Sequence, residues 1–206
     1  MLKQLSLIFG SKMKAQEIVL LLQNAKKVVR QGFFASELLR VEHFCAKNNL
    51  FLVKSEFKVL FADQGVYSNK GVRIPVVDKR PGMYFVYISK DEQKAWLASY
   101  YELVQNHKDL GLVLGYPSCC VTFFCSRFSK NNTNPEHHPT NPYTNLSQRE
   151  LDQVILSHFP CHSDCKESIE LGKKYLQALY VADKEHARKL LTALQVEKQS
   201  SPSRQI

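Results

Sequence analysis

The sequence predicts an α+β fold, in which a small antiparallel sheet is flanked by amino-terminal helices and by a carboxy-terminal helical half. Apolar residues recur at three- and four-residue intervals before residue 48, which is the period of an amphipathic helix. Short runs rich in β-branched and aromatic residues then occupy residues 50–89, and helical periodicity returns after residue 90. We expect one domain over residues 1–195, made of a helical segment (1–48), the sheet (50–89) and a helical half with the cysteine motifs (90–195), followed by a disordered tail (196–206).

Two helices are expected in the amino-terminal segment. The first covers residues 15–29, and its inward positions are Ile18, Leu21, Leu22, Ala25 and Val29. The second covers residues 36–47, and its inward positions are Leu38, Leu39, Val41 and Phe44. Cys45 lies in the second helix without a cysteine neighbour, so we interpret it as a small core residue.

Four short runs predict the strands of the sheet, over residues 51–53, 57–61, 72–77 and 83–88. Segments containing glycine, asparagine or proline separate them, as expected for turns. Pro75 has no backbone N–H to donate to a neighbouring strand, so its strand is expected to be an edge strand or a bulged one.

Capping boxes mark two helix starts in the carboxy-terminal half. The segment from Ser89 to Glu92 is expected to open a helix that ends near residue 107, and the segment from Ser147 to Glu150 one that ends near His158. Residues 129–145, rich in proline and asparagine, are expected to form a loop whose His137 and His138 are solvated. A long helical pattern covers residues 164–194.

Composition indicates the compartment and the class of partner. Lys and Arg outnumber Asp and Glu by 28 to 19, which favours an acidic partner such as RNA. No apolar stretch approaches the roughly 20 residues that cross a bilayer, and the apolar patch over residues 5–9 is too short for a secretory signal. We therefore expect a cytoplasmic protein without a membrane span. In a reducing compartment, close-set cysteines are more often metal-binding or catalytic than disulfide-bonded.

Four of the six cysteines fall in two short motifs, Tyr116-Pro117-Ser118-Cys119-Cys120 and Phe159-Pro160-Cys161-His162-Ser163-Asp164-Cys165. Proline is favoured in the first turn of a helix, so each motif is expected at a helix amino terminus. The free N–H groups there lower the pKa of a thiol, which makes all four sulfurs candidate thiolates. We predict that the two motifs meet in space. Cys125 matches neither motif and is interpreted as a buried or unrelated thiol.

Two kinds of chemistry fit such a site. Cys119, Cys120, Cys161 and Cys165 form a soft ligand set for zinc or for an iron–sulfur cluster, and the spacing does not distinguish the two. Alternatively, one cysteine of low pKa acts as a nucleophile or redox centre that a second cysteine resolves. The candidate catalytic residues are Cys120, His158 and Ser168. His158 fits a metal ligand, a base or a helix-terminal cap equally well.

The two motifs together resemble a mostly archaeal family of uncharacterised proteins, whose members have a Gly-Tyr-Pro-x-Cys-Cys-Val motif and a downstream Pro-Cys-x-x-x-Cys-x-x-Ser motif. The resemblance covers roughly residues 84–179 and implies that Cys119, Cys120, Cys161, Cys165 and Ser168 belong to one site. It implies no activity.

Three functions are therefore expected. The first is a cytoplasmic cysteine-ligated metal or iron–sulfur protein, including an enzyme that acts on RNA or on a sulfur-containing substrate. The second is a thiol-based sulfur-transfer or redox enzyme, and the third is a non-enzymatic RNA-binding module.

Overall fold

The computed structural model describes residues 1–61, 71–127 and 140–196, and its four-stranded antiparallel sheet confirms the predicted α+β class. The strands are β1 (Val28–Phe33), β2 (Phe51–Phe61), β3 (Gly71–Pro75) and β4 (Met83–Ser89), in the spatial order β1-β4-β2-β3. All neighbouring strands are antiparallel, and Val28 pairs with Ser89 where β1 meets β4. The pairing of β2 with β4 is irregular between Lys54 and Lys58.

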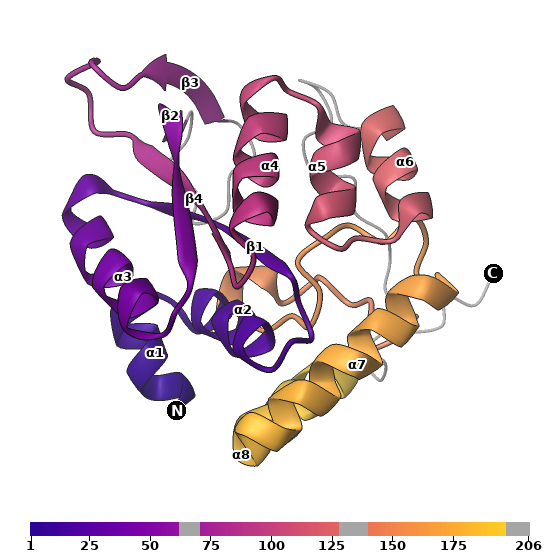
Figure 1. The fold of residues 1–206 in the computed structure, drawn as a ribbon. Coiled ribbons are helices and arrows are strands. Elements are labelled where there is room, and N and C mark those ends of the chain that lie inside the picture. The colour runs from indigo at the N-terminus through magenta and orange to yellow at the C-terminus, as the bar shows by residue number, and fades with distance from the viewer. Residues whose placement is uncertain (62–70, 128–139, 197–206) are drawn as a thin grey trace.

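Helices cover both faces of this sheet (Figure 1). On one side lie α1 (Leu2–Phe9), α2 (Lys12–Leu22) and α3 (Ala35–Lys47). On the other side lie α4 (Glu92–Leu103), α5 (His107–Val113) and α6 (Ser118–Arg127). A short 3-10 turn, η1 (Arg149–Leu151), precedes the last two helices, α7 (Lys166–Ala182) and α8 (Lys184–Val196), which pack together below α2.

Each face of the sheet contributes to its own apolar cluster, because successive side chains of a strand point to opposite sides. Val29 of β1 and Ile88 of β4 pack in the larger cluster, with buried residues of α1, α2 and α3. The same cluster includes Leu179 of α7 and Leu190 of α8, so both ends of the chain share it. The smaller cluster comprises Val28, Tyr87, Ala98, Leu110 and Leu114.

The predicted helix over residues 15–29 is wrong at both ends. Ser11 begins α2 by accepting a hydrogen bond from the Lys14 N–H, and α2 ends at Leu22. Asn24 then takes a left-handed conformation with φ of 58°, which lets the carbonyl of Leu20 accept from the next two N–H groups. The β-branched residues that follow form β1, a strand the sequence prediction lacked. The segment predicted to be helical over residues 1–48 therefore contains an edge strand of the sheet.

Other strand and helix predictions were confirmed with changed boundaries. The two expected strands over residues 51–53 and 57–61 form one strand, β2. Pro75 lies on β3, which is an edge strand as predicted. The helix α3 forms and Cys45 is buried in it, but Leu39 is 77% exposed although it was expected to face inward.

Neither predicted capping box forms. The Ser89 hydroxyl donates to the carbonyl of Lys27, and Asp91 caps α4 by accepting from the Lys94 N–H. The helix expected over residues 147–158 is replaced by η1 and an irregular segment. Val154, Ile155 and Leu156 are consecutive and all buried, and the Val154 carbonyl accepts from the Gln16 side chain. This segment therefore buries its apolar residues without a helical face.

The long helix expected over residues 164–194 is two helices, broken at Asp183. Asp183 ends α7 in a non-helical conformation with φ of −155° and ψ of 84°, and its carboxylate accepts from the His186 N–H at the start of α8. The residues of the expected tail beyond Val196 lie outside the described residues of the chain, as do His137 and His138.

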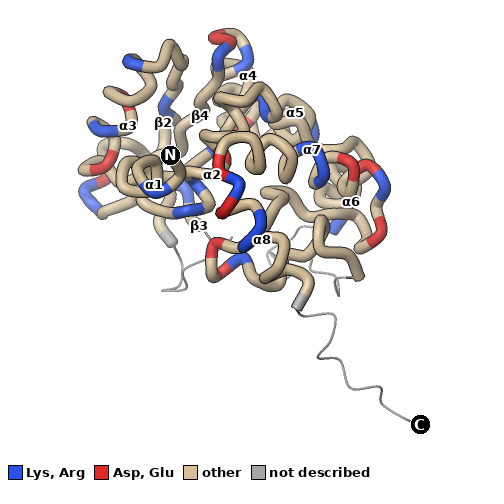
Figure 2. The backbone as a smooth tube through the Cα atoms, turned by 90° about the horizontal axis from the view of Figure 1, so that it is seen from below, with Lys and Arg blue, Asp and Glu red and all other residues tan. Residues whose placement is uncertain are grey.

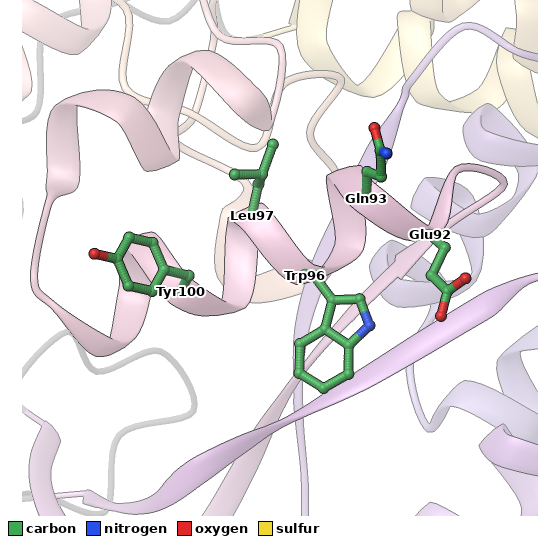
Figure 3. Close-up of a pocket in the computed structure, with 5 residues that line it drawn as sticks. All are labelled: Glu92, Gln93, Trp96, Leu97 and Tyr100. Carbon is green, nitrogen blue, oxygen red and sulfur yellow. The ribbon is translucent and has the colours of Figure 1, made fainter.

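The charged residues are distributed over the surface in both signs, as Figure 2 shows for one view. Lys and Arg are frequent in residues 26–30 and 184–189, but neither segment presents continuous positive charge: Lys26 is buried, and Lys189 on α8 pairs with Glu185. The helix α4 exposes large apolar side chains, among them Trp96 and Tyr100 (Figure 3). Among the described residues, no helix has both the length and the apolar character needed to cross a bilayer.

Candidate metal centre

The first cysteine motif is positioned by a tight connection between α5 and α6. Gly115 has φ of 82°, a left-handed conformation that favours glycine, and the Tyr116 N–H donates to the Gly111 carbonyl as α5 ends. Pro117 then starts α6, since its carbonyl accepts from the Val121 N–H. This confirms the prediction that Pro117 opens the helix carrying Cys119 and Cys120 in its first turn.

The second motif places one cysteine on a helix and one ahead of it. Cys165 is the N-cap residue of α7, and its carbonyl accepts from the Ile169 N–H. Cys161 lies in the irregular segment before α7, five residues from its first residue Lys166, so the second motif precedes the helix that Cys165 caps. The Cys161 N–H donates to the Cys120 sulfur at 3.3 Å. The backbone of the second motif thus contacts the sulfur of the first.

The four sulfurs form one cluster. The sulfur of Cys165 lies 3.7 Å from that of Cys119 and 3.6 Å from that of Cys120, and the adjacent Cys119 and Cys120 sulfurs are 3.8 Å apart. Including Cys161, all four Sγ atoms lie within 4.8 Å of one another. Cys120 and Cys165 are buried, whereas Cys119 and Cys161 are partly exposed. Two cysteine pairs that lie far apart in the sequence therefore have the arrangement of a site able to hold a metal ion.

The thiol pKa values differ from the uniform lowering that helix termini alone would produce. Burial raises the pKa of Cys119 and of Cys120, and it raises the pKa of Cys161 to about 11. Burial also raises the pKa of Cys165, but hydrogen bonds from Ser168 and from the neighbouring thiols outweigh it, so that this pKa is lowered. The expectation of four low-pKa thiols is thus wrong for three of them, because burial opposes the thiolate.

Ser168 and His158 form a buried polar pair beside the cluster. The Ser168 hydroxyl is fully buried on α7 and lies 3.1 Å from the Cys120 sulfur and 2.9 Å from Nε2 of His158. Burial, together with the charges of Lys26 and Arg149, lowers the pKa of His158 to about 3, so the ring is neutral. The structure therefore brings together the three residues that the sequence marked as catalytic candidates, Cys120, His158 and Ser168.

A buried ion pair adjoins this pair of residues, and sequence reasoning missed it. Lys26 pairs with Glu17 of α2 and donates to the Ser157 hydroxyl at 2.8 Å. Tyr116 connects the two regions, because its ring packs against His158 with centroids 5.1 Å apart and its hydroxyl lies 3.4 Å from that of Ser157. No local pattern separates Lys26 from the exposed Lys27 beside it, so the sequence alone carries no signal for this ion pair.

The remaining candidates lie apart from the four sulfurs or at the edge of the cluster. Cys125 is exposed on α6, and Cys45 is buried in α3. Glu167 is in contact with the cluster, since its carboxylate accepts from the thiols of Cys119 and Cys165 at 3.8 and 3.5 Å. Glu167, an acidic residue in the first turn of α7, therefore faces two of the sulfurs.

Comparison of the chain with protein-family models, with curated proteins and with solved structures found no match. The resemblance to the archaeal family therefore stays a prediction.

Proposed function

We propose that this protein binds one zinc ion through the thiolates of Cys119, Cys120, Cys161 and Cys165. The spacing of the sulfurs supports it. A tetrahedral zinc ion with Zn–S bonds of about 2.3 Å holds its sulfurs about 3.8 Å apart. The sulfur pairs among Cys119, Cys120 and Cys165 are separated by 3.6 to 3.8 Å. This match between the required and the observed spacing carries the proposal.

A single ion is favoured over an iron–sulfur cluster. In a cluster the ligating cysteines bind different iron atoms, so the inorganic core separates their sulfurs. The four sulfurs here lie within 4.8 Å of one another, which suits one ion bound by all four. Mononuclear iron has a similar thiolate geometry, and the metal analysis described below distinguishes it from zinc.

The proposed role of the ion is structural. Sites with four protein ligands are closed, whereas catalytic zinc keeps a position for water or substrate. The ion would join the start of α6, the segment around Cys161 and the start of α7, three regions of the chain that few backbone contacts connect. The prediction of an enzyme acting on RNA or on a sulfur-containing substrate is not needed for this role.

Ser168 and His158 support the thiolate of Cys120 in this proposal. A thiolate only accepts hydrogen bonds, so the Ser168 hydroxyl donates to it and in turn accepts from the Nε2–H of His158. This assigns the Nε2–H tautomer to the neutral ring. In this tautomer Nδ1 carries no proton, so the ring nitrogen that has no partner among the described residues is an unpaired acceptor and not an unpaired donor. The pair thus positions a ligand and takes no part in bond making.

Metal analysis of anaerobically purified protein tests the proposal. We expect one zinc per chain, no acid-labile sulfide, and loss of the zinc in Cys120→Ser and Cys165→Ser variants. The matched control is Cys125→Ser, which lies on α6 like Cys120 but is exposed, and it should keep the metal. A folded wild-type protein that binds neither zinc nor iron would contradict the proposal. Detection of acid-labile sulfide would also contradict it, because it would indicate an iron–sulfur cluster at the site.

A thiol redox function is the alternative, and the 3.7 Å separation of the Cys119 and Cys165 sulfurs favours it. In that function the Cys165 thiolate attacks a substrate disulfide and releases one of its sulfurs as a thiolate. The Cys119 thiol then loses its proton and displaces the second substrate sulfur, which leaves a Cys119–Cys165 disulfide and a reduced substrate. Rapid, selective alkylation of Cys165 in zinc-loaded protein would support this alternative over the structural ion.

RNA binding and a cytoplasmic location are also proposals. The formal charge of +9 supports an RNA partner, and four free thiols at one site suit a reducing compartment. Because phosphate contacts release counterions, RNA affinity should fall steeply with salt. Absence of RNA binding at low salt would dispose of that function.

A further inference from the structure

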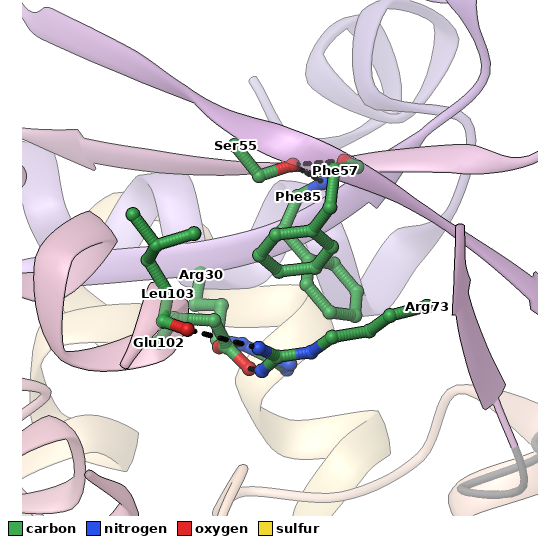
Figure 4. Close-up of polar contacts among 7 residues, drawn as sticks. All are labelled: Arg30, Ser55, Phe57, Arg73, Phe85, Glu102 and Leu103. Atoms are coloured by element: carbon green, nitrogen blue, oxygen red, sulfur yellow. Dashed lines mark hydrogen bonds and ion pairs between the residues drawn. The ribbon is translucent and has the colours of Figure 1, made fainter. Parts of the chain in front are cut away.

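Two arginines share one carboxylate on the face of the sheet that α4 covers. Arg30 on β1 donates through Nε to Glu102 near the end of α4. Arg73 on β3 donates to the other oxygen of Glu102 at 3.1 Å and to the carbonyl of Leu103 at 3.4 Å. Figure 4 shows both guanidinium groups converging on this carboxylate.

The charges of this cluster do not balance. Glu102 is 4% exposed, and a single arginine is enough to neutralise it. The second arginine leaves one positive charge at a partly buried place, where it is less screened than on the surface. Both arginine side chains keep contact with solvent, with exposed fractions of 33% for Arg30 and 28% for Arg73. An ion pair that only holds α4 against the sheet does not explain the positive charge of the second arginine.

The two guanidinium groups are held rigidly. The Arg30 guanidinium carbon lies 3.8 Å from the centroid of the Phe85 ring, and that of Arg73 lies 4.3 Å from the centroid of Phe57. The two rings pack edge to face with centroids 6.0 Å apart. Guanidinium groups fixed by stacking lose little further freedom when they bind a ligand.

Hydrogen-bond donors remain available in the same place. Among the described residues, the two terminal nitrogens of Arg30 donate to no side chain or carbonyl. Tyr87 is buried on β4 beside these charges, and burial together with the nearby Glu102 carboxylate raises its pKa, so that it stays neutral. The planar fork of arginine matches the geometry of an oxyanion.

We propose that Arg30 and Arg73 form a binding site for a phosphate group, with the two terminal nitrogens of Arg30 as bidentate donors. The proposal is independent of the zinc ion. A phosphate group supplies the negative charge that the cluster lacks and the planar pair of oxygens that the Arg30 fork accepts. Its source is either a free phosphate monoester or the phosphodiester backbone of RNA, which share this chemistry.

Binding of three probes to zinc-loaded full-length protein tests the site. The probes are inorganic phosphate, adenosine monophosphate and a single-stranded RNA oligonucleotide. Calorimetry measures the binding of each probe, and fluorescence anisotropy measures RNA binding over a range of salt concentrations. Binding of the small probes indicates a monoester site, and binding of the RNA alone indicates the phosphodiester backbone. Either result supports the proposal, and no binding of any probe at low salt overturns it.

Variants at Arg30 separate a specific site from general positive charge. Arg30→Gln and Arg30→Lys leave Arg73 to neutralise Glu102, so both should stay folded and retain zinc. We expect at least about tenfold weaker binding in each, because lysine lacks the fork. For RNA, the slope of log affinity against log salt should fall by about 0.7 on loss of one phosphate contact in Arg30→Gln.

The matched control is Arg40→Gln, which removes the same charge from an exposed position on α3. It should bind all probes within about twofold of the wild type. Equal losses in Arg40→Gln and Arg30→Gln, or undiminished binding in Arg30→Lys, would overturn the proposal. Thermal unfolding of each variant shows whether any loss of binding comes from loss of the fold.

Discussion

Replacing Ser168 with alanine probes the polar support of the metal site. The hydroxyl is fully buried and contacts both the Cys120 sulfur and Nε2 of His158. Without it, His158 has no partner for either ring nitrogen among the described residues, because its Nδ1 already lacks one. Leaving one more buried polar group unpaired costs about 1–3 kcal/mol of stability.

The same substitution should also weaken zinc binding. Ser168 donates to a metal-bound thiolate in our proposal, and loss of such a supporting hydrogen bond lowers metal affinity by about 10- to 100-fold. Competition with a chromophoric zinc chelator measures the affinity, and urea unfolding of zinc-loaded and chelated protein measures the stability.

The control variant is Ser126→Ala, which removes an exposed hydroxyl of α6 whose one partner among the described residues is the Phe123 carbonyl. It should change neither quantity appreciably. The reasoning would be refuted if Ser168→Ala bound zinc within twofold of the wild type and unfolded at the same urea concentration.

Three further predictions concern the surroundings of the site. Lys26→Met leaves Glu17 buried without its partner and should lower the unfolding free energy by about 3–5 kcal/mol in urea denaturation. Gly111→Ala places a Cβ 2.7 Å from Cγ2 of Val121, so the Val121 side chain or α6 must shift; we expect about 1–3 kcal/mol of destabilisation and weaker zinc binding. His158 is neutral in the native state and has a pKa of about 3, against 6.5 unfolded. The unfolded chain therefore binds an extra proton between these values, and the stability of chelated protein should fall by about 1.4 kcal/mol per pH unit as pH drops through them.

The lysine and histidine predictions have matched control variants, and each of the three predictions has a result that would contradict it. Lys27→Met, at the exposed neighbouring position, should be nearly neutral, and equal effects at both lysines would count against the buried pair. An unchanged zinc affinity in Gly111→Ala would show that the packing of α5 against α6 does not influence zinc binding. His158→Gln should flatten the pH dependence whereas His43→Gln, exposed on α3, should not, and identical slopes in the two variants would refute the role of His158.

The sequence predicted the meeting of the two cysteine motifs better than the boundaries of the helices. Proline is favoured in the first turn of a helix, and this local signal correctly placed Cys119 and Cys120 in the first turn of α6. No local signal predicts that the second motif packs against the first, because this contact depends on the tertiary fold. The clustering of cysteines in a sequence expected to be cytoplasmic suggested the contact, and the sulfur distances agree with it.

The misplaced elements depend on backbone conformations and tertiary contacts that the period of apolar residues does not report. The period of apolar residues continues smoothly from α2 into β1, and only the left-handed Asn24 marks the change. Between Ser147 and His158, a tertiary contact from Gln16 to the Val154 carbonyl replaces helical hydrogen bonds. The lowered pKa expected for the thiols likewise failed for Cys120, because burial is a property of the assembled fold and no local pattern reports it.

X-ray absorption at the zinc edge of the purified protein shows which atoms bind the ion. We expect one zinc per chain with a single shell of four sulfurs at about 2.3 Å. Nitrogen or oxygen atoms in that shell, or a folded protein without stoichiometric metal, would contradict it.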